Sequence, residues 1–83
     1  MTPDDVRRAS FARSSFGKRG YDERSVDELL DRIEAHLSNP EAGSLTVEDV
    51  RSAGLPKSAI GTRGYARHDV DAFLDQVVRD WPR

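Results

Sequence analysis

The side chains able to carry out chemistry in this 83-residue sequence are few, and their spacing builds no catalytic centre. The chain has no cysteine, and no metal-binding motif joins its two histidines, His36 and His68, which we expect at the surface. Two pairs of aspartates are spaced four residues apart, as on one face of a helix: Asp27 with Asp31, and Asp71 with Asp75. With no histidine or third carboxylate nearby, these pairs are expected to be solvated or to interact with a helix dipole. The sequence therefore predicts a non-enzymatic protein with no metal and no cofactor.

A second feature is positive charge beside single apolar residues. Residues 6–19 hold five basic side chains and no acidic one, and residues 50–67 hold four and none. Each segment also has one prominent apolar residue directly before a glycine, Phe16 in the first and Ile60 in the second. Basic surfaces attract polyanions, and an apolar side chain among them could insert into an anionic membrane. The alternative is that Phe16 and Ile60 fold back against the helices, since such residues are often buried.

The elements that position these segments occur twice, because the sequence repeats itself. A shift of 44 positions places Thr2 on Thr46 and Leu37 on Trp81, with 14 identities over 36 positions and no gap. We interpret residues 2–37 and 46–81 as two repeats. Residues 38–45 join them and are rich in turn formers, as expected of a linker.

Each repeat begins with the pattern of a short helix. Thr2 is suited to be the N-cap of the first, with Asp5 three residues later in the capping-box position. Thr46 and Asp49 keep this pattern in the second repeat. We expect the two helices to end near residues 9 and 53. Further along, Gly20 and Gly64 are expected to serve backbone geometry, and the tyrosine after each to close the loop over the next helix.

A longer amphipathic helix follows each loop. Asp22 is suited to cap the first, which should reach His36 or Leu37, whereas Ala66 leaves the second without a side-chain cap and prone to fray. One apolar stripe on each helix is expected to pair with the other. The helix-pairing residues are Val26, Leu29, Leu30, Ile33, Leu37, Val70, Phe73, Leu74, Val77 and Trp81. The sequence predicts an all-α fold, with two tandem short-helix/loop/long-helix repeats in a pseudo-symmetric bundle.

The loop and long-helix motifs resemble a known family. The runs FGKRGYD (16–22) and VDELLD (26–31) are similar to the N-terminal domain of DivIVA-type proteins, which are bacterial cell-division and polar-growth scaffolds. The second repeat carries the same motifs as IGTRGY (60–65) and VDAFLD (70–75). The resemblance is nearest to actinobacterial forms.

This resemblance implies a module that lies in the cytoplasm, peripheral on the inner membrane at the septum or pole. In the family, apolar and basic residues at the loop tip contact the membrane. The matching residues are Phe16, Lys18, Arg19, Ile60 and Arg63. Thr62 occupies the position equivalent to Lys18, so the second tip should bind lipid more weakly. DivIVA-family or divisome proteins are the partners that the resemblance suggests.

The family's long helix pairs with its twin in a parallel dimer and continues into a coiled coil. This chain instead has two repeats and ends soon after the second long helix. We therefore expect a monomer in which the repeats pair within one chain, or a small homo-oligomer.

Two other functions stay open on the sequence. In the first, the chain is a protein-interaction adaptor whose acidic helices dock on a DivIVA-like coiled-coil partner without lipid contact. In the second, the GxxG sequences at 17–20 and 61–64 clamp a nucleic-acid backbone, as in KH domains. That motif requires an α/β sheet, whereas this sequence shows no strand pattern and has a net charge of −2. We therefore expect no nucleic-acid partner.

Overall fold

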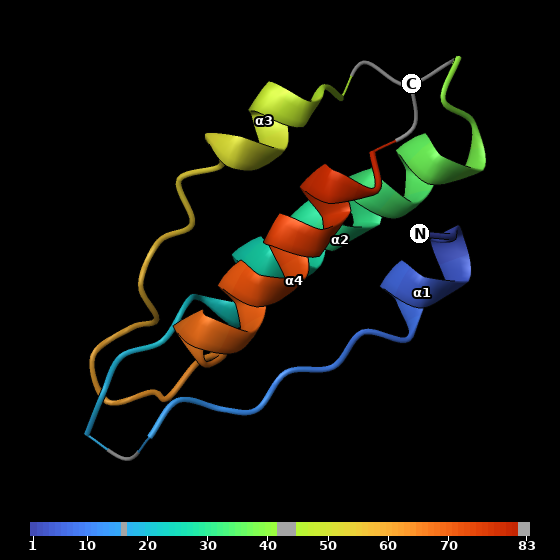
Figure 1. Ribbon diagram of the computed structural model, residues 1–83. Coiled ribbons are helices and arrows are strands. Elements are labelled where there is room, and N and C mark those ends of the chain that lie inside the picture. Colours follow the sequence, from blue (N-terminus) through green and yellow to red (C-terminus); the bar gives the residue numbers. More distant parts are fainter. Residues whose placement is uncertain (16, 42–44, 82–83) are drawn as a thin grey trace.

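The described parts of the chain, residues 1–15, 17–41 and 45–81 of a computed structural model, form four helices and no strand. The helices are α1 (Pro3–Arg7), α2 (Glu23–Ser38), α3 (Val47–Arg51) and α4 (Arg67–Arg79). They build an elongated rod of 42 × 19 × 17 Å (Figure 1). The predicted all-α class is thus confirmed for these residues. No helix within these ranges is long and apolar enough to cross a bilayer.

Both short helices begin at the predicted caps. The Thr2 hydroxyl accepts the Asp5 N–H at 3.2 Å, and the Asp5 carboxylate accepts the Thr2 N–H at 2.9 Å. Thr46 and Asp49 repeat this capping box at 3.1 and 2.9 Å. The backbone N–H of each threonine stabilises the charged carboxylate that it contacts. The pKa values of Asp5 and Asp49 therefore lie below their usual range. The two helices end two residues earlier than the sequence predicts.

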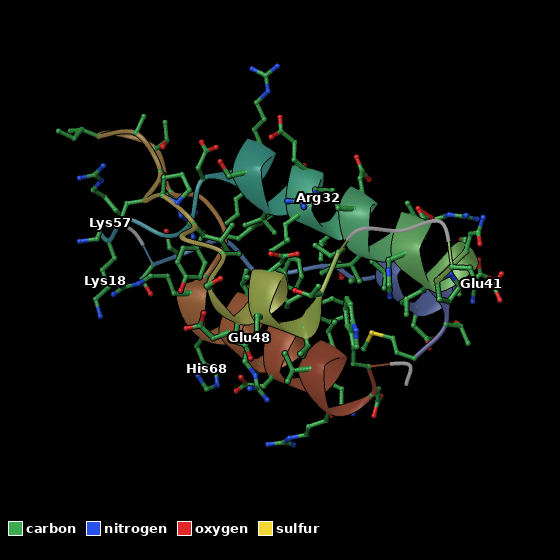
Figure 2. All side chains as sticks on the ribbon, turned by 90° about the horizontal axis from the view of Figure 1, so that it is seen from above. Lys18, Arg32, Glu41, Glu48, Lys57 and His68 are labelled. Carbon is green, nitrogen blue, oxygen red and sulfur yellow. The ribbon has the colours of Figure 1, made fainter. Side chains whose placement is uncertain are left out.

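The long helices α2 and α4 form the length of the rod and run side by side in the same direction (Figures 1 and 2). Asp22 caps α2 as predicted, since its Oδ2 accepts the N–H and the hydroxyl of Ser25 at 3.0 and 2.9 Å. Ala66 gives α4 no side-chain cap. Helix α2 reaches Ser38, so the first residue of the predicted linker is helical.

The predicted apolar stripes lie in or against one core. Leu45, which the sequence places in the linker, is also buried there, together with Val6 of α1 and Val50 of α3. Of the ten predicted pairing residues, the buried ones are Val26, Leu29, Leu30, Ile33, Val70 and Val77. The half-buried ones, packed against the core, are Leu37, Phe73, Leu74 and Trp81.

Between its short and long helices, each repeat has an extended arm that runs along the rod, turns at its tip and returns (Figure 1). On the first arm, the ring of Phe11 packs edge-on against Tyr65 and Phe73, with ring centroids 5.3 and 5.6 Å apart. Both partners belong to the second repeat. Leu55, the equivalent residue of the second arm, also packs against the core. The arms therefore contribute to the packing that holds the rod together.

His36 is 8% exposed, so the prediction that it lies at the surface is wrong. Its ring stacks on Trp81, with centroids 4.7 Å apart and an interplanar angle of 12°. His36 lies in the last turn of α2, so the stack is at the end of the rod away from the arm tips (Figure 1). His68 is exposed, as predicted (Figure 2).

Candidate functional site

The two arms meet at one end of the rod and hydrogen-bond to each other (Figure 1). The Tyr21 N–H donates to the Tyr65 carbonyl at 2.9 Å, and the Tyr65 N–H donates to the Tyr21 carbonyl at 3.0 Å. Nearby, the Gly20 N–H donates to the Arg63 carbonyl at 3.0 Å, and the Ser58 N–H donates to the Gly20 carbonyl at 2.8 Å. These antiparallel contacts join residues 20–21 of the first arm to residues 57–65 of the second arm. We call the surface formed by residues 17–21 and 57–65 the paired tips.

Two equivalent serines, Ser14 and Ser58, are buried beneath the paired tips. The Ser14 hydroxyl lies within donating distance of the Lys18 carbonyl, at 2.8 Å, and of the Arg63 carbonyl. The Ser58 hydroxyl donates to the Thr62 carbonyl at 3.2 Å. Each serine thus holds the turn of its own arm. This role was not predicted from the sequence, although the serines are identical at equivalent positions of both repeats.

Gly20 and Gly64 are buried where the two backbones pass close to each other. A Cβ on Gly20 would overlap the Tyr65 carbonyl, and one on Gly64 would overlap the Tyr21 carbonyl and the Ser58 side chain. Gly64 also has φ +64°, a conformation that favours glycine. The backbone role predicted for these glycines is therefore to permit the close contact between repeats.

Arg19 and Arg63 tie the arms together in equivalent ways. The Arg19 Nε donates to the Ser58 carbonyl at 2.8 Å, and the Arg63 Nε donates to the Ser14 carbonyl at 2.7 Å. Both residues stay exposed. Within the described ranges, no carboxylate lies within 4.0 Å of either guanidinium. Their charge is therefore not neutralised by an ion pair there.

Four of the five predicted tip residues lie together around one open groove of about 300 Å³. The residues lining it include Lys18, Arg19, Ile60 and Arg63. Ile60 is 87% exposed, so the alternative in which it folds back against the helices is wrong. Phe16, the other predicted apolar tip residue, lies outside the described residues. The groove thus joins three cations and one exposed aliphatic side chain.

Some of the basic side chains counted in the sequence are neutralised away from the groove. Arg7 donates from Nε to Glu34 at 2.7 Å, which raises the pKa of the guanidinium. Arg13 forms an ion pair with Glu23. Lys57, by contrast, lies at the same end of the rod as Lys18 (Figure 2). Within the described ranges, the three cations of the groove and Lys57 form no ion pair.

Tyr21 and Tyr65 also connect each arm to the long helix of the other repeat. The Tyr21 hydroxyl donates to Asp71 at 2.7 Å, and the Tyr65 hydroxyl donates to Asp27 at 3.0 Å. The bond to Asp71, assisted by burial, raises the pKa of Tyr21. Burial, assisted by the bond to Asp27, raises the pKa of Tyr65. The sequence predicted solvated aspartates and missed these partners. In the described ranges, no three acidic or histidine residues form a metal-binding group.

We predict that the double variant Tyr21→Phe/Tyr65→Phe is less stable near neutral pH by about 0.5–1 kcal/mol per bond, because the bonds are partly solvated. The pKa of each tyrosine is raised above its ordinary value of 10.0. The stabilisation is therefore complete below about pH 10 and is lost as the pH rises through the folded-state pKa. Urea unfolding at about pH 8 and about pH 11 measures this. Between these two pH values, the wild type should lose more free energy of unfolding than the variant. Equal losses would contradict the two tyrosine–aspartate hydrogen bonds.

Comparison with known proteins gives local similarity to one group. The chain is 45% identical over 38 residues to the Cell wall synthesis protein Wag31 of Mycobacterium tuberculosis, covering 46% of this chain and 15% of that protein. The Wag31 proteins of Mycobacterium leprae and Mycolicibacterium smegmatis match with the same identity over 14% of their lengths. No family model matches the chain, and no solved structure matches it significantly. The match supports a DivIVA-type relationship over less than half of this chain.

Proposed function

We propose that this chain is a non-catalytic, DivIVA-like module that binds anionic membrane through its paired tips. The observation that carries the proposal is the exposed Ile60 in a groove lined by Lys18, Arg19 and Arg63. Burying such a side chain in lipid contributes about 1.5–3 kcal/mol. Each basic residue near an anionic leaflet adds about 1 kcal/mol. Together these contributions are enough for reversible, salt-dependent attachment.

The local similarity to Wag31, whose name describes a cell wall synthesis protein, supports a proposed cellular role. A module of this kind would act in cell division or polar growth. It would lie in the cytoplasm and attach to the inner membrane at the septum or pole. DivIVA-family and divisome proteins are the partners that this placement favours.

We further propose that the two repeats pair within one chain as a pseudo-symmetric unit. Equivalent backbone bonds support this, since the Asp22 N–H donates to the Pro56 carbonyl and the Ala66 N–H donates to the Ala12 carbonyl, both at 2.8 Å. These two bonds are related by the same shift of 44 positions as the sequence repeat. One chain then presents both tips without needing a second copy.

We predict that the protein co-sediments with phosphatidylglycerol vesicles but not with phosphatidylcholine vesicles. Raising the salt from about 0.1 M to about 0.5 M should weaken binding, because the Debye length shortens. Ile60→Ser should lower vesicle affinity by about tenfold or more, from loss of the buried apolar surface. Ile60→Leu is the matched control and should bind like the wild type.

The adaptor alternative gives a different result in the same assay. A folded protein that binds neither vesicle type at any salt concentration would contradict the membrane proposal. It would favour docking on a coiled-coil partner without lipid contact.

A further inference from the structure

We infer that the groove between the paired tips is a specific site for one phosphate group, that of an anionic phospholipid headgroup. The inference rests on the proposed membrane function and deepens it, because a defined site saturates whereas diffuse attraction does not. The groove receives Lys18 and Arg19 from the first arm and Arg63 from the second. No acidic side chain is among the described residues that line it.

The two arginines are held in place before any ligand arrives. Each donates from Nε to a carbonyl of the opposite arm, at 2.8 Å for Arg19 and 2.7 Å for Arg63. Because a guanidinium is planar, an anchored Nε–H restricts the positions that the terminal amino groups can take. These amino groups make no hydrogen bond to the protein within the described ranges. Preorganised donors lose less entropy on binding, and their geometry matches phosphate oxygens.

Ile60 favours a lipid over a free phosphate ion as the source of this group. It lines the same groove as the cations and is 87% exposed. A phosphate bound by the cations would therefore lie beside an aliphatic side chain, as the headgroup lies beside the acyl chains in a leaflet. The volume of about 300 Å³ is at the lower end for ligand pockets, which suits a headgroup rather than a larger molecule.

The site is asymmetric and fits one headgroup per chain. Lys18 supplies a third cation on the first arm, whereas the equivalent position on the second arm is Thr62. The Thr62 hydroxyl donates to the Ala59 carbonyl at 2.7 Å, so it is used within its own turn. Two of the three cations of the groove therefore come from the first arm.

The test is an NMR titration of the full chain with dihexanoylphosphatidylglycerol below its micelle concentration. We expect saturable shifts of the Arg19 and Arg63 Nε–H signals. Lys18→Thr copies the residue of the second arm and should weaken binding by about tenfold, the effect of one charged contact. Lys57→Thr removes a cation at the same end that does not line the groove, and it should change affinity less than twofold. Unchanged helical circular dichroism controls for folding.

Three results would overturn the inference in distinguishable ways. Non-saturating shifts that weaken equally in both lysine variants would replace the site with diffuse attraction. Inorganic phosphate binding as tightly as the lipid would identify a free-phosphate site. Vesicle binding without saturable lipid shifts would remove the site but keep the proposed membrane function. Conversely, saturable shifts without vesicle binding would support the phosphate site and contradict the membrane function.

Discussion

Gly20→Ala should destabilise the protein by about 3 kcal/mol, at the upper end of the cost of overpacking. The added Cβ would overlap the Tyr65 carbonyl, which is backbone and has no rotamer by which to move away. Relief requires the arms to separate, which would break the reciprocal bonds between Tyr21 and Tyr65. Urea unfolding followed by circular dichroism measures the loss. The same change should also lower vesicle affinity, because the groove needs both arms.

Two other glycines make this experiment specific. Gly54→Ala places its Cβ in open space and should change stability by no more than about 0.5 kcal/mol. Gly17→Ala also meets no neighbour, but its φ of +85° adds backbone strain, and a loss of about 1 kcal/mol is expected. A cost for Gly20→Ala no larger than that for Gly17→Ala would contradict the close approach of the two arms.

Ile33→Ala is expected to cost about 2–5 kcal/mol, the range for large-to-small changes in a core. Ile33 is 0% exposed and lies in the middle of the apolar stripe of α2. A domain of this kind has a total stability of about 5–15 kcal/mol, so the loss would be a large fraction of it. Thermal or urea unfolding of the purified variant measures the change.

Ile60→Ala is the matched control, because it is the same substitution at a site that is 87% exposed. It should leave stability within about 0.5 kcal/mol of the wild type while weakening vesicle binding. Ile33→Ala should lower stability but leave vesicle binding unchanged at temperatures where the variant remains folded. Similar stability losses in the two variants would contradict the assignment of one isoleucine to the core and the other to the tip.

The features that could be predicted from the sequence are those set by local signals. Caps at Thr2 and Thr46 need only a hydroxyl and a carboxylate three residues apart, and both formed as expected. The apolar stripes follow from helical spacing, and they lie in the core. The surface position predicted for His36 was wrong because it was based on the polarity of histidine. His36 follows Ile33 by three residues and therefore shares its buried face. The helical spacing of His36 from Ile33 indicates burial more correctly than its residue type does.

The contacts that build the paired tips could not be predicted in this way. The bond from Tyr21 to Asp71 spans 50 residues, and that from Arg19 to Ser58 spans 39. Neither spacing is one at which a single helix or turn brings two residues together. Such bonds depend on how the arms cross, which hydrophobic periodicity does not specify. The basic and apolar character of the tips was readable, whereas the exposure of Ile60 required coordinates.

In the proposed pairing within one chain, a substitution changes one repeat alone, whereas in a homodimer every substitution appears on both partners. On one side of the rod, Arg7 of α1 is fastened to Glu34 of α2. On the other side, the position equivalent to Glu34 is Val78, so Arg51 instead pairs with Glu48 inside α3. A single substitution at one of these positions therefore alters the surface on one side of the rod and leaves the other side unchanged. The surfaces around α1 and α3 can therefore change independently. A partner protein that contacts both surfaces would bind the rod in one orientation only.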